Sequence, residues 1–309
     1  MNHSEDVSTA SRDLKLSITT PVLTKLPGSS PDWEQSGSIE DVARIAAAAD
    51  RLGYHHMTCS EHVAVPAAEL NRRGARYWDP LATFGFLAAR TTRLRFMTNV
   101  LVLPYHHPLE IAKRYGTLDV VSGGRLILGI GVGTLREEFE LIGAPYEDRG
   151  PRADDALRAL RAAMSTPEPF YHGEFYSFEN FVVDPCAVQP RVPLWVGGRT
   201  PRSLRRAAHF ADGWCPFGVK PSQAIEWLSR IEVPTGFEVL LPSVRRLDPL
   251  NDPQGARETL AETGECGATI VAVKFAHRSL EEYLANLEAL AEIHLRSPGS
   301  SSSTVLQTN

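Results

Sequence analysis

The sequence predicts a (β/α)8 barrel, and three observations support this fold class. Short apolar runs alternate with amphipathic helical segments, giving eight strand-helix units along the chain. Apolar strands covered by helices are typical of a parallel sheet that is buried on both faces. The chain has 309 residues, a length that such barrels use within one domain. An open, doubly wound sheet is the alternative topology.

The first half of the chain supplies four of the expected units. Ser38 and Asp41 have the spacing of a capping box before the first helix, and Gly53 follows the end of that helix. Proline recurs in the first turn of later helices, where no backbone N–H is needed. The expected strands cover residues 14–19, 54–58, 94–99 and 126–131, and the expected helices cover residues 39–52, 80–90, 108–121 and 154–164.

The second half repeats the pattern four more times. Ser279 and Glu282 have the spacing of a capping box at the start of the last helix, whose apolar residues recur on one face. The expected strands cover residues 194–196, 213–215, 237–241 and 269–273, and the expected helices follow Thr200, cover residues 223–230 and 255–263, and follow Ser279.

One connection is much longer than the others. Residues 132–193, between the fourth and fifth strands, contain two apparent helices and an aromatic, turn-rich segment at 170–188. An excursion of this length in a compact domain is usually functional, and we interpret it as part of a lid. Residues 1–12 and the Ser-rich residues 296–309 have too little apolar content to pack, so we expect disordered tails around one domain at 13–295.

The composition excludes several classes of protein. The net charge is −5 and the arginines are dispersed, so the chain lacks the positive field that nucleic-acid binding needs. No apolar run has the form of a signal sequence or the length of a membrane span. The four cysteines are far apart, which argues against a disulfide framework or a metal site. We therefore expect a soluble, cytoplasmic protein that binds no nucleic acid, membrane or metal.

Glycines cluster where the fourth strand ends. The stretch from Arg125 to Gly133 is a buried strand that continues into a loop with Gly129, Gly131 and Gly133. Glycine lets backbone N–H groups approach an anion closely, so this loop is a candidate for binding a cofactor phosphate. A tight turn is the structural alternative. The loop also lacks the third glycine of the dinucleotide fingerprint, because that position is Arg136.

A second candidate anion site follows the fifth strand. Gly197, Gly198 and Arg199 precede a helix that starts at Thr200 and Pro201. Helix starts attract anions through free N–H groups and the macrodipole, and a guanidinium adds a charged donor. An ordinary βα loop with a surface arginine is the alternative. Because loops after successive barrel strands lie side by side, the two glycine loops together favour one phosphate site.

Polar side chains follow the second and third strands at the same face. Glu61 and His62 come directly after the second strand, and Asn99 ends the third. The reacting groups of (β/α)8 enzymes gather at the carboxyl ends of the strands. Histidine exchanges protons near neutral pH, so His62 is a candidate for proton transfer, with a structural role as the alternative. His107 lies directly before a helix, where capping is the expected role.

Several distinctive segments occur in a fixed order. An ungapped stretch at 99–133 contains LP-x-x-HP, AK, LD-x-x-SGGR and G-x-G. The other segments are SEHV at 60–63, EEFELIG at 137–143, YHGEFYSF at 171–178 and PLWVGGRTPRSLRRAAHFADGW at 193–214. Together they resemble the luciferase-like monooxygenase family, which includes the coenzyme F420-dependent oxidoreductases, over nearly the whole chain.

The resemblance implies a barrel that binds FMN or its 5-deaza analogue, coenzyme F420, with the ring over the barrel mouth. It places the cofactor phosphate on the loops after the fourth and fifth strands. It also implies a cis peptide bond between Asn99 and Val100, next to the ring. The cofactor-binding residues that it implies are His62, Asn99, Val100, Gly131, Gly133, Thr134, Gly197, Gly198 and Arg199.

The resemblance also implies a catalytic pair. Several deazaflavin enzymes of the family have an acid and a histidine beside the ring, and the matching residues are Glu61 and His62. Glutamate stands here in place of the more usual aspartate. His106 stands where arginine is common, so the contact that arginine makes in relatives is not carried over.

The function implied is that of a coenzyme F420-dependent oxidoreductase, which transfers a hydride between the deazaflavin and a small organic substrate. That substrate would be a carbonyl compound, an alcohol or an activated alkene. The alternative is an FMN-dependent, oxygen-using monooxygenase with a separate flavin reductase, because both branches share these motifs. A flavin-binding barrel without catalysis is a remote third hypothesis.

The family alone suggests a homodimer. The substrate cannot be inferred, because specificity depends on loop side chains that vary on a fixed barrel. Candidates to line its pocket, with ordinary packing as the alternative, are Trp33, Tyr77, Trp78 and Phe170.

Overall fold

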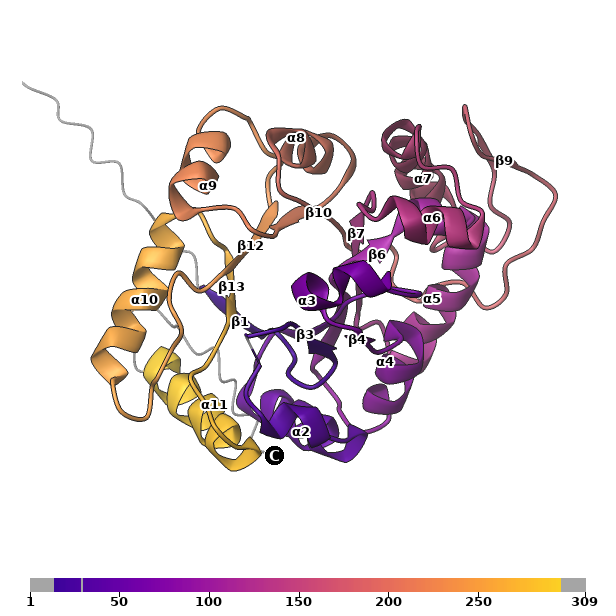
Figure 1. Cartoon of the computed structure of the whole chain (residues 1–309). Helices are drawn as coiled ribbons and strands as arrows, with labels where there is room; N and C mark the ends of the chain where they lie inside the picture. Colours follow the sequence, from indigo (N-terminus) through magenta and orange to yellow (C-terminus); the bar gives the residue numbers. More distant parts are fainter. Residues whose placement is uncertain (1–13, 29, 296–309) are drawn as a thin grey trace, which may run out of the picture.

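Eight parallel strands form a closed barrel in the computed structural model, which describes residues 14–28 and 30–295 (Figure 1). The ring closes where β10 pairs with β7, with Leu194 opposite Leu128. The (β/α)8 prediction is therefore confirmed, and the open sheet is excluded. The expected tails lie outside the described residues. The barrel strands are β1 (Lys15–Ile18), β3 (His56–Cys59), β5 (Arg95–Thr98), β7 (Leu126–Gly131), β10 (Leu194–Gly198), β11 (Gly213–Pro216), β12 (Glu238–Pro242) and β13 (Ile270–Val273).

A helix follows each barrel strand, and these helices surround the barrel (Figure 1). Ser38 and Asp41 form the expected capping box, and Gly53 ends α2 with a φ of 80°. None of the described helices combines the length and the apolar composition that crossing a bilayer requires. The helices of the ring are α2 (Ile39–Leu52), α4 (Pro80–Ala88), α5 (Pro108–Ser122), α7 (Arg149–Ala163), α8 (Pro201–Phe210), α9 (Pro221–Leu228), α10 (Pro253–Glu265) and α11 (Leu280–Leu295).

Three helices begin earlier than the sequence pattern predicts, and one of them is α9, which starts at Pro221 rather than at 223. Helix α7 starts at Arg149 rather than at 154, because Pro151 lies in the first turn, where its missing N–H has no intrahelical partner to lose. Helix α10 starts at Pro253, because the side chain of Asp252 accepts a hydrogen bond from Gly255 N and caps the helix.

Side chains alternate in direction along each barrel strand. One set points toward the barrel axis and forms a separate apolar cluster, and the residues between them pack in the larger cluster beneath the helices. This alternation decides which side chains reach the mouth at the carboxyl ends of the strands. The inward cluster consists of Met97, Ile127, Trp195, Cys215, Leu240, Ile270 and Ala272, with Val100 packed against it.

The chain bulges directly after β5. The peptide bond between Asn99 and Val100 is cis, as the family resemblance implies. After it, β6 (Leu101–Val102) pairs with β7 beyond the end of β5, with Leu101 opposite Ile130. The bulge therefore lies at the carboxyl end of β7.

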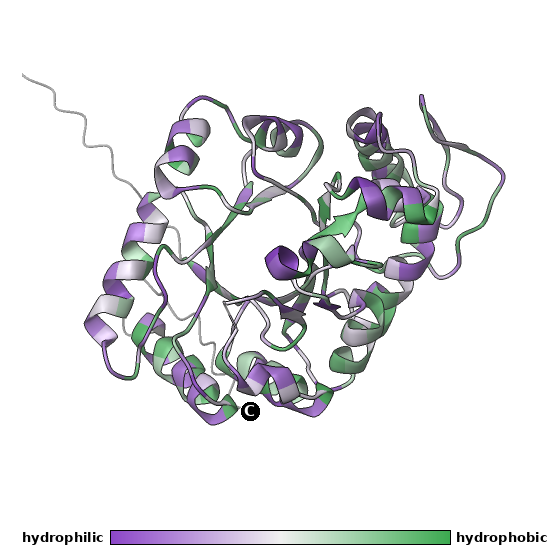
Figure 2. Cartoon of the chain, viewed as in Figure 1, coloured by the Kyte–Doolittle hydropathy of each residue, from purple (hydrophilic) through white to green (hydrophobic). Residues whose placement is uncertain are grey.

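Two insertions that the sequence pattern did not indicate meet at the mouth. The β1–α2 connection contains β2 (Thr24–Lys25) and α1 (Trp33–Ser36). The β3–α4 connection contains the 3-10 turn Ala67–Glu69, α3 (Leu70–Arg73) and β4 (Arg76–Tyr77), which pairs with β2. Figure 2 shows α3 as a polar turn within the ring, beside the apolar β6 and β7.

The lid interpretation is wrong for residues 170–188. Their hairpin, β8 (Tyr171–His172) and β9 (Ser177–Phe178), lies outside α7 at the edge of the ring (Figure 1). The carboxylate of Asp155 on α7 holds it there, accepting hydrogen bonds from the Tyr171 hydroxyl at 2.6 Å and from Phe175 N at 2.8 Å. A buried carboxylate with several donors is a strong attachment point, so the hairpin extends the outer wall. The parts of this excursion that reach the mouth are Thr134, after β7, and α6 (Arg136–Ile142).

We expect Asp155→Ala to release the hairpin, because backbone N–H groups and a hydroxyl lose a common acceptor whose side chain is 1% exposed. The free energy of unfolding should fall by about 3 kcal/mol in chemical denaturation. Proteolytic cleavage between residues 170 and 180 should become faster. Glu179→Gln, which changes an exposed carboxylate of the same hairpin, is the control. Hairpin cleavage at the wild-type rate in the Asp155 variant would contradict this account.

Candidate active site

His62 is held at the mouth by a buried carboxylate. Its Nδ1 lies 2.8 Å from Oε2 of Glu138, on α6, and its ring packs edge-on against Tyr77 at 4.4 Å between centroids. The side chain of His62 is 17% exposed and that of Glu138 is fully buried. The packing and the hydrogen bond together fix the orientation of the imidazole.

Glu138 connects three segments of the mouth. Its Oε1 accepts hydrogen bonds from Val63 N at 2.6 Å and Ala64 N at 3.2 Å, and its Oε2 accepts one from the Tyr105 hydroxyl at 2.8 Å. Burial raises the pKa of Glu138, but the hydrogen bonds from His62, Tyr105 and Val63 outweigh it and hold the pKa below its usual range. Burial and the bond to Glu138 raise the pKa of Tyr105, so the phenol stays protonated.

The ionised state of Glu138 determines the tautomer of His62. A carboxylate only accepts hydrogen bonds, so Nδ1 of His62 carries a proton. In the neutral ring, Nε2 is then the unprotonated nitrogen. No group in the described part of the chain forms a hydrogen bond with Nε2, which leaves this atom to a ligand.

Glu61 and His62, the acid and histidine that the resemblance implies, are bonded to different partners. Glu61 accepts a hydrogen bond from Val102 N at 2.7 Å, and its other oxygen lies 2.7 Å from Nε2 of His106. Burial lowers the pKa of His106, but the hydrogen bond and charge of Glu61 outweigh it and raise the pKa overall. Glu61 is therefore directed to the bulge after β5, and His62 is directed to α6.

His107 has the capping role that its position predicts. Its Nδ1 accepts a hydrogen bond from Leu109 N at 3.2 Å, at the start of α5.

Glycine is needed in the two loops because neighbouring side chains leave no room for a Cβ atom. A Cβ on Gly131 would lie 2.7 Å from one methyl of Val100, and a Cβ on Gly197 would lie 2.5 Å from the other. Both positions face the barrel axis, so the two glycines leave the space that Val100 fills. The bulge and the glycines together form an apolar floor across the ends of β7 and β10.

The other two loop glycines are also crowded. Gly133 has a φ of 74°, and a Cβ there would lie 2.6 Å from the ring of Phe139. Gly198 has a φ of 143°, and a Cβ there would lie 2.6 Å from Cβ of Ser203. Positive φ and close contact both require glycine at these sites. Protein contacts alone therefore account for these four glycines, with or without a phosphate. Gly129 lies within β7, where a Cβ would lie 2.0 Å from the carbonyl oxygen of Thr98.

Potential anion-binding groups surround this floor. Thr134 follows β7, and its hydroxyl accepts a hydrogen bond from the guanidinium of Arg73, on α3, at 3.3 Å. Arg199 follows β10 and is exposed. Val196 and Ile130 are paired across β10 and β7, so the two loops leave neighbouring strands. The structure thus brings Arg73, which is also paired with Glu69 at 3.2 Å, to Thr134 at the end of β7, and Arg199 directly follows β10.

Another polar cluster lies across the mouth, after β1 and β13. The indole Nε1 of Trp33 donates a hydrogen bond to Nδ1 of His277 at 3.0 Å. Burial, together with the charge of Arg246, lowers the pKa of His277 to about 4, so this histidine is neutral at physiological pH. The carboxylate of Glu34 lies 3.7 Å from Nε2 of His277 and accepts a hydrogen bond from Val22 N at 3.0 Å.

The four aromatic candidates have different surroundings. Tyr77 packs on His62 and Trp33 packs on His277, so both line the mouth. Trp78 is partly buried against the outer apolar cluster. Phe170 is 63% exposed on the outer hairpin, away from the mouth.

Sequence reasoning missed Glu138, although a signal was present. Leu135, Phe139 and Ile142 recur at helical spacing, and Glu138 lies on the same face of the helix. A carboxylate on an apolar face is rarely buried without partners, so this position indicated a buried polar contact. Arg73 had no such signal, because α3 was not expected.

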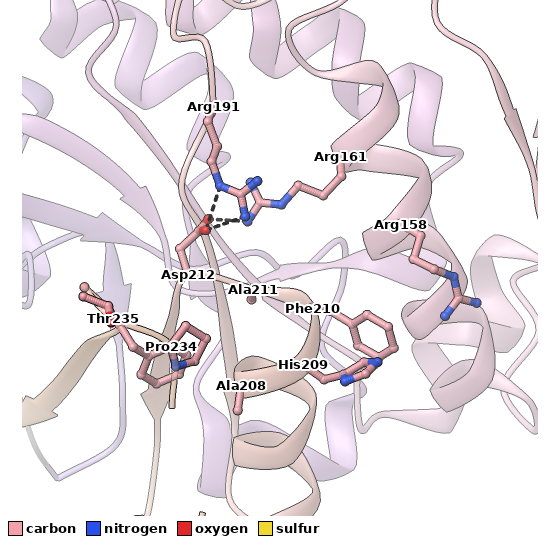
Figure 3. Close-up of a pocket in the computed structure, with 12 residues that line it drawn as sticks. Arg158, Arg161, Arg191, Ala208, His209, Phe210, Ala211, Asp212, Pro234 and Thr235 are labelled. Atoms are coloured by element: carbon pink, nitrogen blue, oxygen red, sulfur yellow. Dashed lines mark hydrogen bonds and ion pairs between the residues drawn. The ribbon is translucent and has the colours of Figure 1, made fainter. Parts of the chain in front are cut away.

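A cavity of about 640 Å³ lies at the opposite end of the barrel (Figure 3). Asp212 and Phe237, which line it, directly precede β11 and β12, so the cavity lies at the amino ends of the strands. Figure 3 shows Arg161 and Arg191 directed toward Asp212, and both form ion pairs with it. None of the site residues described above lines this cavity.

Sequence comparison finds relatives in Mycobacterium tuberculosis. One uncharacterized protein is 35% identical over 201 residues, which cover 61% of this chain and 69% of that protein. Another is 31% identical over 264 residues, which cover 81% of this chain and 92% of that protein.

Structure comparison finds the same fold in enzymes with different cofactors. The monooxygenase RslO1 from Streptomyces bottropensis has a TM-score of 0.69 at 22% identity, covering 90% of this chain and 98% of that chain. An F420-dependent secondary alcohol dehydrogenase, in complex with an F420-acetone adduct, has a TM-score of 0.68 at 12% identity. The match covers 92% of this chain and 100% of that chain. The oxygenating component of 3,6-diketocamphane monooxygenase from Pseudomonas putida, in complex with FMN, has a TM-score of 0.65 at 14% identity. The match covers 90% of this chain and 97% of that chain.

A family model described as luciferase-like monooxygenase matches residues 20–233, which is well over half of the chain. The match covers the bulge after β5, both glycine loops, and His62 with Glu138. This protein is therefore an enzyme of the luciferase-like monooxygenase family.

Proposed function

We propose that this enzyme is a coenzyme F420-dependent oxidoreductase that transfers a hydride between the deazaflavin and a carbonyl compound, an alcohol or an activated alkene. The observation that carries the proposal is the oriented His62. Its Nδ1 is bound to the ionised Glu138, and its Nε2 is left for a ligand at the mouth. Hydride transfer to or from an oxygen-bearing carbon needs one proton donor or acceptor, and this atom meets that need.

The residues around the bulge fit a flavin-like cofactor. Val100 covers the inward glycines and gives an apolar surface on which a planar ring can lie. Arg73, Thr134 and Arg199 supply charged and hydroxyl donors where β7 and β10 end, which is the chemistry that a phosphate requires. These residues would hold the cofactor phosphate, with the ring over Val100.

The cofactor, when bound, accepts or donates the hydride, and the protein handles the proton. In alcohol oxidation, neutral His62 accepts the hydroxyl proton at Nε2. The resulting imidazolium is stabilised by Glu138, which remains a carboxylate throughout. In the reverse direction the same nitrogen returns the proton to the carbonyl oxygen.

The second candidate function is that of an FMN-dependent monooxygenase supplied by a separate flavin reductase. The similarity to the monooxygenase RslO1 and to the FMN-bound component of 3,6-diketocamphane monooxygenase supports it, because both have the same barrel. The similarity to the F420-dependent alcohol dehydrogenase supports the first candidate. A cytoplasmic location and a homodimer stay predictions under either function.

Titration with each cofactor tests the proposal. Purified protein should bind coenzyme F420 in a fluorescence titration and should bind FMN more weakly. Stopped-flow mixing of the reduced complex with oxygen should give no rapid reoxidation. Tight FMN binding without F420 binding, or fast reaction with oxygen, would establish the second candidate instead.

We expect His62→Ala to lower turnover by roughly 100-fold or more, because a positioned general acid-base typically contributes that much. Cofactor affinity should change by less than about threefold, because the floor and the phosphate donors are retained. Cofactor absorbance with a panel of alcohols and ketones measures turnover. The control is His107→Gln, which alters the cap of α5 and a ring contact with the outer hairpin, both away from His62. Full turnover in His62→Ala would remove this residue from the mechanism.

Glu138→Gln tests the orientation of His62 separately. The amide keeps the volume but loses the negative charge that stabilises the imidazolium, so kcat should fall while KM stays within about threefold. The pH dependence of kcat should also change, which a purely structural role would not produce. Recovery of kcat in Glu138→Asp would support a role for the carboxylate. An unchanged pH profile of kcat in Glu138→Gln would exclude that role.

Glu61 is expected to act on stability through His106. The pKa of His106 is raised in the folded state, so the pair contributes stability below the unfolded pKa and loses it as pH rises through the folded pKa. Glu61→Gln should therefore reduce the free energy of unfolding more at about pH 6 than at about pH 9. NMR titration of the Glu61→Gln variant should show a lower pKa for His106 than in the wild-type protein. In a His106→Gln background the pH dependence of the effect should disappear, and its persistence would count against this pair.

A further inference from the structure

The cavity at the amino ends of the strands is lined by three guanidinium groups. Arg158 and Arg161 lie on α7, and Arg191 lies in the segment before β10. Among the described residues that line the cavity, the one carboxylate is that of Asp212, directly before β11. Figure 3 shows the guanidinium groups of Arg161 and Arg191 meeting at this carboxylate. The cavity therefore has a cationic wall, built from segments that are far apart in the sequence.

Arg161 and Arg191 share a single carboxylate. Arg191 donates to Oδ1 of Asp212 from Nη2 at 2.8 Å and from Nε at 3.0 Å, and Arg161 donates to Oδ2 from Nη2. Leu194 N also donates to Oδ2, at 2.9 Å, so both oxygens of the carboxylate are occupied. Two guanidinium groups and one carboxylate leave one positive charge that no other acidic side chain of the described residues pairs with.

Arg161 is the least solvated of the three cations. Its side chain is 20% exposed, and its buried Nε has no hydrogen-bond partner among the described residues. Burial lowers the pKa of Arg161 and the charge of Arg191 lowers it further, although Asp212 opposes both effects. A partly buried cation beside a like charge is stabilised by an additional anion.

The outer N–H groups of the other two arginines are available to a ligand. Within the part of the chain that the structure describes, Nη1 of Arg158 and Nη1 of Arg191 form no hydrogen bond. Their side chains are 46% and 64% exposed, so molecules in solution reach them. Arg158 adds donors rather than net charge, because its Nη2 is bonded to Asp155 at 3.1 Å. Guanidinium groups recognise phosphate and carboxylate oxygens through charge-assisted hydrogen bonds.

The size and the apolar part of the wall indicate a ligand larger than a bare ion. The volume of about 640 Å³ is within the range of small-molecule sites. Phe210 and Pro234 add apolar surface, and the guanidinium of Arg158 lies over the ring of Phe210 at 5.3 Å from its centroid. A molecule with a ring beside its anionic group would contact both the apolar and the cationic parts of the wall.

We propose that this cavity is a second binding site, which takes a phosphate monoester that carries an organic ring. The tetrahedral oxygens of a phosphate can accept hydrogen bonds from guanidinium groups in different planes, whereas a planar carboxylate pairs with one guanidinium at a time. The site is independent of the proposed function, because the residues of the mouth do not line it. One bound molecule would join α7, the segment before β10, and the starts of β11 and β12.

Binding of simple aromatic probes tests the proposal. Phenyl phosphate, benzoate and neutral benzamide are titrated by calorimetry into the purified protein. We expect phenyl phosphate to bind about tenfold or more tightly than the other two, because charge-assisted hydrogen bonds supply at least that much. Arg191→Gln, which leaves the pair of Arg161 with Asp212 in place, should remove most of this difference. Arg205→Gln deletes the same charge on an exposed part of α8 outside the cavity and should leave it unchanged.

Hydrogen exchange locates the bound probe. In the wild-type protein, phenyl phosphate should slow amide exchange at 208–212 and 235–237, which border the cavity. This measurement does not depend on the folding of a variant. Slower exchange at 131–134 instead, with binding weakened in Arg199→Gln but not in Arg191→Gln, would place the phosphate at the mouth and overturn the proposal. Benzoate or benzamide binding as tightly as phenyl phosphate, or an equal loss in Arg205→Gln, would overturn it as well.

Discussion

The pairing of β7 with β10 is the constraint on which the rest of the molecule depends. It closes the sheet, and closure gives every strand an inward and an outward row with no edge left open. The inward positions at the ends of these two strands are Gly131 and Gly197, and Val100 fills the space above them. The apolar floor of the mouth is therefore a direct result of barrel closure and of the bulge after β5.

Glu138 organises the polar side of the mouth. One fully buried carboxylate joins the loop after β3, the turn that carries Tyr105, and α6. Its burial would be unfavourable without partners, and four hydrogen bonds compensate for it. The same bonds keep it ionised, which fixes the proton on Nδ1 of His62 and leaves Nε2 for a ligand. The same hydrogen bonds therefore keep Glu138 charged and fix the orientation of His62.

The two ends of the barrel have different chemistry. At the amino end, Arg161 and Arg191 share the carboxylate of Asp212, and Lys15 is paired with Glu238. At the carboxyl end, the buried carboxylate of Glu138 is bonded to an imidazole, a phenol and backbone N–H groups rather than to a guanidinium or an ammonium group. Ion pairs therefore gather at the amino end of the barrel, while the mouth carries the polar groups of the candidate active site.

Much of the fold could be predicted from the sequence. Apolar periodicity and caps such as Ser38 gave the order and type of all eight units, because these signals depend on neighbouring residues. The family resemblance located His62 and the cis bond after Asn99. Only the tertiary structure decided that His62 pairs with Glu138 and that Glu61 pairs with His106. His62 and Glu138 are 76 positions apart and meet because β3, β5 and β7 pair side by side, a pairing that no local pattern in the sequence records.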